Sequence, residues 1–310
     1  MSGEITVKSI EKSLQFWYYV RSMQKPQPLP VFFGLHSSDF RGFSVPPGLR
    51  KKQGESMNRK EDLIAVFDSG VGGISVLRHL VRLLPGERFL YYGDSANAPY
   101  GPRSREAVEA LTMEAAEALV DRGLKALVVA CNTATSAAIS SLRRRWPELI
   151  IIGIEPALKL AVDTFPRGRI GVMATEMTLR EEKFSRLLDR YGDEHTICKL
   201  PAPGLVELVE AGKGNSPEAE QLLTELLGPY QGSLDALVLG CTHYPFAAGA
   251  IAHVLGPRTA LLDGGEGTAR ETRRRLREAG LLEQGRGQIF LENSSGDPGL
   301  IALSKTLLSE

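Results

Sequence analysis

Two of the three cysteines in this sequence occupy the same place in similar local patterns. Cys131 follows the apolar run "ALVVA" and Cys241 follows "ALVLG", and each is followed by a polar pair, Asn-Thr in one case and Thr-His in the other. A thiol has an ordinary pKa of about 8.5, so it can both take and give a proton near neutral pH. Two thiols on opposite faces of a carbon can invert it, because one removes the hydrogen while the other protonates the far side. The pair therefore predicts two-base proton transfer at a C–H bond.

The cysteines and the glycine-rich turn also fit simpler roles. A cysteine in an apolar strand is usually a small buried hydrophobe, and Cys198 in "TICKL" fits that description. Cys241 and His243 resemble half of a metal site, but no second ligand pair with zinc spacing accompanies them. The turn "DSGVGG" lacks the third glycine of a dinucleotide fingerprint and the Gly-Lys-Ser/Thr of a phosphate loop. We therefore expect no metal and no cofactor.

Strands and helices alternate from Leu63 onward and predict where the cysteines lie. The apolar runs "LIAVF", "RFLYYGD", "ALVVA" and "LIIIGI" predict buried strands, and helical patterns follow the first three of them. The order then repeats with "RIGVMAT" and "ALVLGC". Ligands of open α/β sheets bind beyond the carboxyl ends of the strands, where both cysteines lie. We expect two pseudo-symmetric, doubly wound (flavodoxin-like) α/β domains with parallel sheets and the active site in the cleft between them.

The expected domain organisation divides the chain into three parts. Residues 61–158 together with 263–310 form the first α/β domain, and residues 159–262 form the second. Residues 1–60 carry ten Lys/Arg against four Asp/Glu and show no sustained hydrophobic period. Three interpretations of this segment stay open: a flexible or partly docked extension, a regulatory arm, or an upstream reading of a gene that starts at Met57.

The composition limits the class of protein. Hydrophobic residues make up 43% of the 310 residues, 24% are charged, and the formal net charge is zero. This balance gives no electrostatic support for binding nucleic acid, which we do not expect as a partner. No apolar run approaches the ~20 residues of a membrane-spanning helix, so no membrane association is expected. Three cysteines do not form a disulfide framework, and they favour a cytoplasmic location.

Several longer motifs resemble one family. "IAVFDSGVGGISVL", "YYGDSANAPYG", "VVACNTATSA", "GIEPALK" and "VLGCTHYPF" are similar, in order and spacing, to the glutamate racemases of the aspartate/glutamate racemase superfamily. The resemblance runs from about Ile64 to Arg275. It implies an isomerase that interconverts L- and D-glutamate without a cofactor, and that supplies D-glutamate for peptidoglycan, the bacterial cell wall.

The same resemblance implies the residues of the site. The catalytic positions that it implies are the acid/bases Cys131 and Cys241, their assisting groups Asp68 and His243, and the orienting carboxylates Asp94 and Glu210. The substrate-binding positions that it implies are Asp68, Ser69, Tyr100, Gly101, Asn132, Thr133, Thr178, Thr242 and His243.

Partners and alternative functions follow from the same motifs. The family resemblance implies glutamate as the substrate and a homodimer. The resemblance also suggests two further partners, a cell-wall precursor as an activator and DNA gyrase as a binding partner. The sequence supports neither of these. One alternative is a racemase of aspartate or of another amino acid in the same superfamily. A second is a hydrolase with Cys241 as nucleophile and His243 as base, which would leave Cys131 without a role. A third is a non-catalytic binding protein on the same fold.

Overall fold

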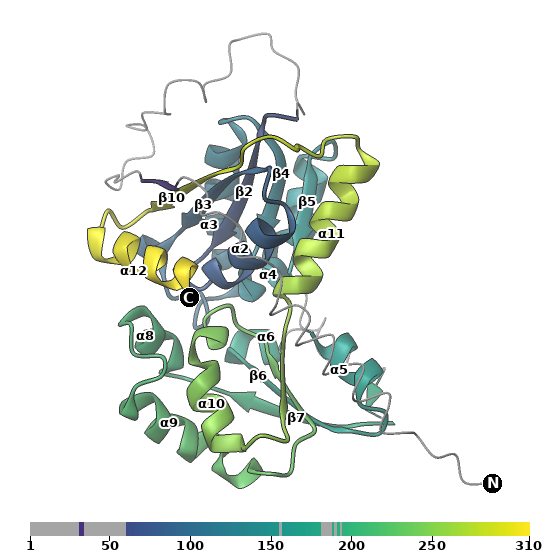
Figure 1. The fold of residues 1–310 in the computed structure, drawn as a ribbon, viewed down its shortest axis with the longest axis vertical. Coiled ribbons are helices and arrows are strands. Elements are labelled where there is room, and N and C mark those ends of the chain that lie inside the picture. Colours follow the sequence, from purple (N-terminus) through teal and green to yellow (C-terminus); the bar gives the residue numbers. More distant parts are fainter. Residues whose placement is uncertain (1–30, 34–59, 155–156, 181–187, 189–190, 193) are drawn as a thin grey trace, which may run out of the picture.

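The chain folds into two lobes, each built on a parallel β-sheet (Figure 1). The computed structural model describes residues 31–33, 60–154, 157–180, 188, 191–192 and 194–310. The strands of the first sheet, in spatial order, are β1 (Val31–Phe33), β10 (Gln288–Asn293), β3 (Arg88–Gly93), β2 (Leu63–Asp68), β4 (Leu124–Val129) and β5 (Ile150–Gly153). Those of the second are β7 (Thr196–Pro201), β6 (Arg169–Ala174), β8 (Ala236–Leu239) and β9 (Ala260–Asp263). The predicted pair of parallel α/β domains is confirmed.

The two sheets share one strand order. Strands β2 to β5 lie side by side as β3-β2-β4-β5, and strands β6 to β9 lie as β7-β6-β8-β9. The pairings within both sets are parallel. Cys131 follows β4 and Cys241 follows β8, and these two strands hold equivalent places in their sheets. The repeat in the sequence is therefore a repeat in the fold.

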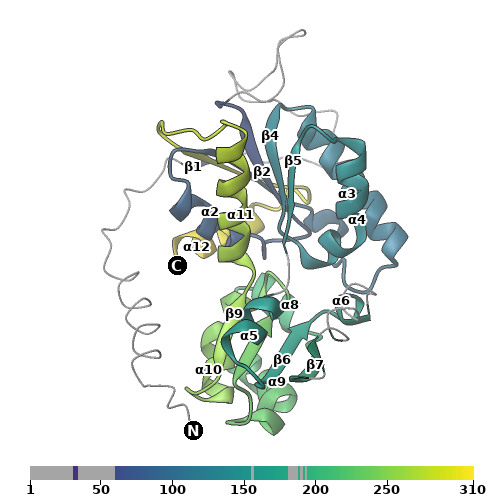
Figure 2. The same cartoon turned by 90° about the vertical axis from the view of Figure 1, so that its right-hand side faces the viewer.

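Helices cover both faces of the first sheet, as Figure 2 shows. On one side lie α2 (Ile74–Leu83), α11 (Gly265–Glu278) and α12 (Pro298–Ser309), and on the other lie α3 (Arg105–Val120) and α4 (Asn132–Arg145). Because successive side chains of a strand point to opposite faces, Ile64 and Val66 of β2 pack with the first group of helices. Ala65 and Phe67 pack with the second group. A strand buried on both faces has to be apolar throughout, which explains the uninterrupted run "LIAVF".

The second lobe is layered in the same way. On one face lie α8 (Leu205–Glu210), α9 (Pro217–Leu227) and α10 (Ala248–Leu255), and on the other lie α5 (Leu158–Thr164) and α6 (Glu176–Arg180). The described residues also form the 3₁₀ turns η2 (Ser95–Asn97), η3 (Gly228–Tyr230) and η4 (Tyr244–Ala247). Met173 and Leu239 of the second sheet belong to the same apolar cluster as Ile64 and Val66 of the first. The two lobes thus share part of one core.

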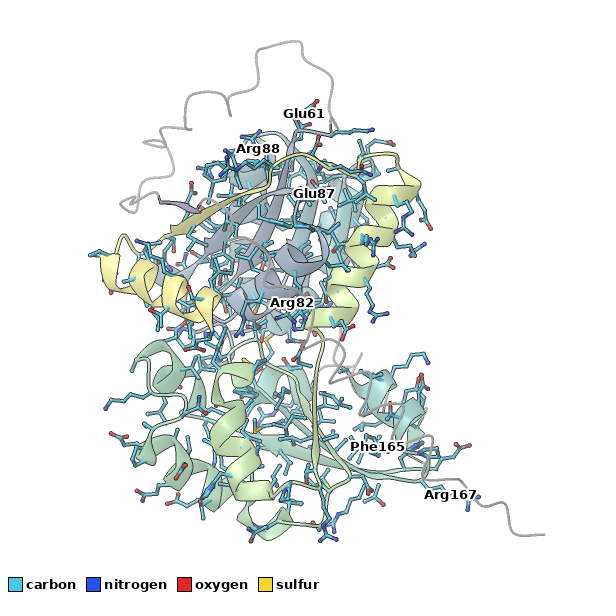
Figure 3. The ribbon with its side chains drawn as sticks, viewed as in Figure 1. Glu61, Arg82, Glu87, Arg88, Phe165 and Arg167 are labelled. Carbon is cyan, nitrogen blue, oxygen red and sulfur yellow. The ribbon has the colours of Figure 1, made fainter. Side chains whose placement is uncertain are left out.

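A buried ion pair holds the end of the first sheet that lies away from the second lobe. Lys125, at the start of β4, lies 2.5 Å from Glu87, and both side chains are fully buried. The Lys125 ammonium also donates to the backbone carbonyls of Lys60 and Leu281. Figure 3 marks Glu87 at this end, together with Glu61 and Arg88. The strands run from here toward the second lobe, so their carboxyl ends meet it.

The N-terminal segment is described only in part. Residues 1–30 and 34–59 lie outside the described residues. The three interpretations of the extension concern these residues and stay open. Within it, β1 pairs in parallel with β10, Val31 opposite Ile289 and Phe33 opposite Leu291. The proposed domain boundaries at 158/159 and 262/263 stay a prediction. Within the described part of the chain, no helix combines the length and the apolar character needed to cross a membrane.

Candidate active site

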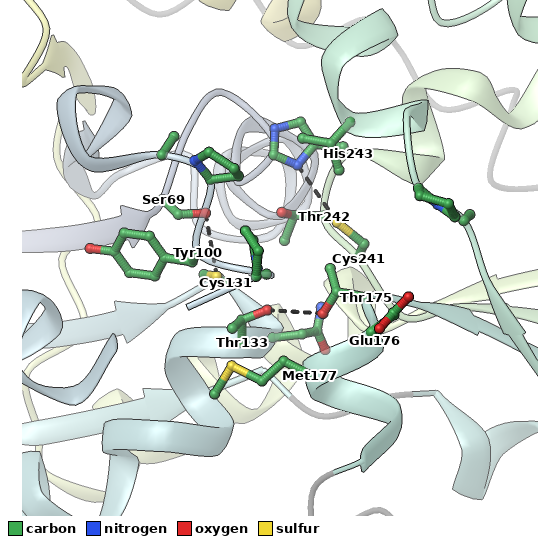
Figure 4. Close-up of a pocket in the computed structure, with 18 of the residues that line it drawn as sticks. Ser69, Tyr100, Cys131, Thr133, Thr175, Glu176, Met177, Cys241, Thr242 and His243 are labelled. Atoms are coloured by element: carbon green, nitrogen blue, oxygen red, sulfur yellow. Dashed lines mark hydrogen bonds between the residues drawn. The ribbon is translucent and has the colours of Figure 1, made fainter. Parts of the chain in front are cut away.

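Both predicted catalytic thiols line one cavity between the lobes. The cavity has a volume of about 740 Å³ and lies at the carboxyl ends of the central strands (Figure 4). The predicted residues on its wall are Ser69, Tyr100, Gly101, Cys131, Asn132 and Thr133 from the first lobe, and Glu210, Cys241, Thr242 and His243 from the second. The structure thus brings ten predicted residues, from segments far apart in the sequence, to one surface.

Cys131 sits at the start of a helix. It is the N-cap residue of α4, and its sulfur accepts a hydrogen bond from the Ala134 N–H at 3.4 Å. The Ser69 hydroxyl lies 3.5 Å from the same sulfur. Burial, aided by the negative charge of Asp68, raises the pKa of the Cys131 thiol to about 12, although the two hydrogen bonds oppose this. Burial thus favours the protonated thiol form of Cys131, which has a proton to give.

Cys241 belongs to a hydrogen-bonded chain with His243 and Glu210. The Cys241 sulfur lies 3.7 Å from His243 Nδ1, and His243 Nε2 lies 3.0 Å from Glu210 Oε1. Burial alone would lower the pKa of His243, but its hydrogen bonds to Cys241 and Glu210 and the nearby negative charges raise it well above 6.5. His243 is thus an imidazolium with two N–H donors. In this form it can donate one N–H to Glu210 and the other to the Cys241 sulfur.

Asp68 lies at the end of β2 and is held from both lobes. Its side chain is fully buried. One carboxyl oxygen accepts from the Gly70 N–H and the other from the Thr242 hydroxyl, both at 3.0 Å. Burial raises the pKa of Asp68 above its ordinary value, while the charge of His243 and the two hydrogen bonds act against this. Asp68 does not line the cavity wall; it lies beneath it and connects the "DSG" turn to the residue after Cys241.

The hydroxyl-bearing residues form one cluster across the cavity. Thr133 Oγ1 lies 3.3 Å from Thr175 Oγ1, which lies 3.0 Å from Thr178 Oγ1. Thr175 is on the cavity wall, whereas Thr178 is buried behind it and is not among the lining residues. The side-chain oxygen of Asn132 is buried at the wall and accepts no hydrogen bond from any described residue. This oxygen and the hydroxyls can meet the polar groups of a small ligand.

Asp94 contacts the cavity through a residue that lines it. It accepts a hydrogen bond from the Tyr100 hydroxyl at 2.7 Å and from the Asn97 side-chain amide at 3.1 Å. Tyr100 lines the cavity and Asp94 does not. The orienting role of Asp94 stays a prediction, and this geometry supports it through Tyr100.

Cys198 stays outside the cavity. It lies on the edge strand β7, is partly exposed, and is not among the residues that line the cavity. Across the described ranges, no group of three or more His, Cys, Asp and Glu side chains is arranged to hold a metal ion.

Two residues that hydrogen-bond to the backbone of the site could not be identified from the sequence. The Ser75 hydroxyl donates to the Thr242 carbonyl at 2.9 Å, and the Tyr91 hydroxyl donates to the Gly70 carbonyl at 2.6 Å. Both lie inside apolar helix and strand patterns, where a single hydroxyl is indistinguishable from an ordinary core residue. Only the folded arrangement identifies them.

The fold and the site agree with the chain's similarity to known proteins. A profile of the Asp/Glu/Hydantoin racemase family matches residues 64–272. The chain belongs to this family, and it is therefore a racemase, an isomerase that acts on a stereocentre.

Its relatives include glutamate racemases. The enzyme of Clostridium botulinum (strain Alaska E43 / Type E3) is 47% identical over 255 residues, which cover 81% of this chain and 99% of that protein. The crystal structure of the Thermus thermophilus enzyme in complex with β-chloro-D-alanine is 41% identical. It has a TM-score of 0.70 and covers 81% of this chain and 94% of that one. The Escherichia coli enzyme, crystallised with L-glutamate and the activator UDP-MurNAc-Ala, is 30% identical. It has a TM-score of 0.69 and covers 80% of this chain and 95% of that one. The resemblance to glutamate racemases is confirmed.

Proposed function

We propose that this protein interconverts L- and D-glutamate by proton transfer between two thiols. The observation that carries the proposal is the pair of cysteines on one cavity, Cys131 after β4 and Cys241 after the equivalent strand β8. Each sulfur has its own polar partners: the Ala134 N–H and the Ser69 hydroxyl lie beside Cys131, and the His243 imidazole lies beside Cys241. The raised thiol pKa of Cys131 suits it to act as the acid, and the imidazole beside Cys241 suits that sulfur to act as the base.

The proposed reaction has two proton transfers. The Cys241 sulfur takes the α-proton of one enantiomer, so a C–H bond breaks, an S–H bond forms, and the electron pair stays on a flattened α-carbon. Cys131 then gives its thiol proton to the opposite face, where a new C–H bond forms. The product is the mirror image, and Cys131 is left as a thiolate, to which the Ala134 N–H and the Ser69 hydroxyl can donate. The other enantiomer runs the same steps in reverse.

The walls of the cavity suit an amino acid with two carboxylates. The side-chain oxygen of Asn132, which no described residue contacts as a donor, can accept from the ammonium group. Hydroxyls of Thr133 and Thr175 and the N-terminus of α4 can donate to carboxylate oxygens, and a helix N-terminus favours anions. These contacts stabilise negative charge that moves from the α-carbon into the adjacent carboxylate.

The biological setting is part of the proposal. The D-glutamate formed would be used in the cytoplasm for the synthesis of peptidoglycan. The E. coli relative was crystallised with the activator UDP-MurNAc-Ala, so a cell-wall precursor is the first regulator to examine. The homodimer stays a prediction. The gyrase contact stays one as well, without support from the neutral charge.

Circular dichroism of L-glutamate and L-aspartate incubated with the purified protein tests the function directly. We expect the L-glutamate signal to decay to zero without added pyridoxal phosphate, and the α-position to take up one deuterium in D₂O. A decay with aspartate alone would favour the aspartate alternative. No decay with either amino acid would contradict the proposal.

The pH dependence of kcat/KM should reflect the charge on His243. Because the protonated imidazole is the form that donates to Cys241, activity is present below the His243 pKa and is lost as the pH rises through it. That pKa lies well above 6.5, so the alkaline limb should too. In Glu210→Gln the imidazolium loses its carboxylate partner, and the limb should move to lower pH. An alkaline limb at the same pH in both proteins would contradict this assignment.

A further inference from the structure

A buried tyrosine hydroxyl contacts the turn between β2 and α2 but has no role in the proposed reaction. Tyr91 lies on β3 with 1% of its surface exposed, and it is not among the residues that line the cavity. Its hydroxyl donates to the Gly70 carbonyl at 2.6 Å. Gly70 belongs to the turn between β2 and α2, next to Asp68 and Ser69. Tyr91 therefore touches the backbone of the turn rather than any reacting group.

The peptide that Tyr91 contacts continues into the second lobe. The Gly70 carbonyl and the Val71 N–H belong to one peptide unit, and the Val71 N–H donates to Glu210 Oε1 at 3.4 Å. The same carboxylate oxygen accepts from His243, which in turn contacts Cys241. A peptide whose carbonyl accepts a hydrogen bond becomes more polarised, and its N–H becomes a better donor. One directed chain of hydrogen bonds thus runs from Tyr91 to Glu210, the carboxylate that holds the imidazolium.

The close approach in this chain depends on glycine. A Cβ atom on Gly70 would lie 2.1 Å from Glu210 Oε1, so no larger residue allows the carboxylate to rest against the turn. Glycine at position 70 therefore allows the turn of the first lobe to contact Glu210 of the second lobe directly. The titratable groups that act on His243 here are Cys241, Glu210 and Asp68, and those that face Tyr91 are Asp68, Glu210 and Cys131.

We propose that Tyr91 is a positioning residue for the Cys241 half of the reaction. Its hydroxyl fixes the Gly70–Val71 peptide, and through that peptide the first lobe holds Glu210 against His243. This inference rests on the proposed function, since it requires Cys241 to be one of two acid/bases. It separates the two halves of the site: Tyr91 supports the proton transfer at Cys241 and leaves the transfer at Cys131 unaffected.

The test compares Tyr91→Phe with Tyr92→Phe. Tyr92 is the next residue on the same strand, is also buried, and packs on the opposite face of the sheet beside Phe67. Because the equilibrium constant of a racemisation is one, kcat/KM must change equally for both enantiomers. We expect a loss of about fivefold to tenfold in Tyr91→Phe, the effect of one buried hydrogen bond, and less than about twofold in Tyr92→Phe.

The deciding measurement is the deuterium isotope effect on kcat/KM with α-deuterated L- and D-glutamate. If only the transfer at Cys241 is slowed, the isotope effect rises for the enantiomer whose deuterium faces Cys241. It falls for the mirror image, since abstraction by Cys131 then limits the rate less. Glu210→Gln should shift the two isotope effects in the same sense as Tyr91→Phe.

The outcomes separate this inference from the function on which it rests. A wild-type protein that does not racemise glutamate refutes the proposed function before any variant is made. If the wild type is active, then equal changes of the isotope effect for both enantiomers, unchanged isotope effects, or shifts opposite to those of Glu210→Gln overturn the role of Tyr91. Should Tyr91→Phe fail to fold, fluorotyrosine at position 91 keeps the ring and strengthens the donated hydrogen bond. Its isotope effects should move opposite to those of Glu210→Gln, and unchanged values would overturn the inference.

Discussion

Replacing either Cys131 or Cys241 by alanine should abolish the racemisation of glutamate from both enantiomers. Each direction needs one thiol to remove the α-proton and the other to protonate the opposite face, so the loss of either stops both directions. Positioned acid/base groups contribute about 10²–10⁴-fold each, and we expect kcat/KM to fall by about three orders of magnitude in each variant. The decay of the circular dichroism signal of L- and of D-glutamate measures this.

Cys198→Ala is the matched control for both variants. Cys198 lies on the edge strand β7, outside the cavity, so its replacement should leave kcat/KM unchanged. Thermal unfolding of the three variants should show that all remain folded, since each replacement removes only one sulfur atom from the side chain. Full racemase activity in Cys131→Ala would refute the two-thiol mechanism.

The fold was predictable where burial dictates the residue types. β2, β4 and β8 are buried along their whole length, so their sequences are continuous or nearly continuous apolar runs that stand out from the amphipathic helices around them. The pairing of β10 with β3 has no such signal. It joins Gln288 to Arg88 across most of the chain, and nothing local in either strand specifies the other. The half-exposed edge strand β7 is similarly hard to find, because only one of its six residues is buried.

The site was predictable as far as strand ends define it. Because equivalent strands end at equivalent places, the repeated cysteine pattern was sufficient to predict that the two sulfurs share one cavity. The contacts that cross between the lobes were not predictable. Thr242 reaches Asp68 across 174 positions and Val71 reaches Glu210 across 139, and these distances depend on how the two lobes face each other. The contact of Tyr91 was not predictable either, because its hydroxyl reaches the Gly70 carbonyl only when the turn between β2 and α2 has folded.

Gly72→Ala should impair the reaction strongly because Gly72 lies where the lobes meet. A Cβ atom there would lie 2.4 Å from His243 Nδ1 and 2.5 Å from Thr242 Oγ1. His243 Nδ1 is the atom that contacts the Cys241 sulfur, and Thr242 Oγ1 is the donor to Asp68. The added methyl group must displace both contacts or push the lobes apart. A misplacement of about 1 Å can cost about 10²-fold, and we expect kcat/KM to fall by that order.

Gly267→Ala tests whether this effect is specific to the junction. Gly267 lies on an exposed part of α11, and a Cβ atom there would meet no described residue within 4 Å. Alanine favours the helix by about 1 kcal/mol over glycine, so the midpoint of thermal unfolding should rise slightly while kcat/KM stays unchanged. In Gly72→Ala, the loss of activity should come with far-ultraviolet circular dichroism like that of the wild type, since each lobe keeps its own core. Wild-type kcat/KM in Gly72→Ala would mean that the reaction does not require the lobes to close to this distance, and would remove the contact between Thr242 and Asp68 from the mechanism.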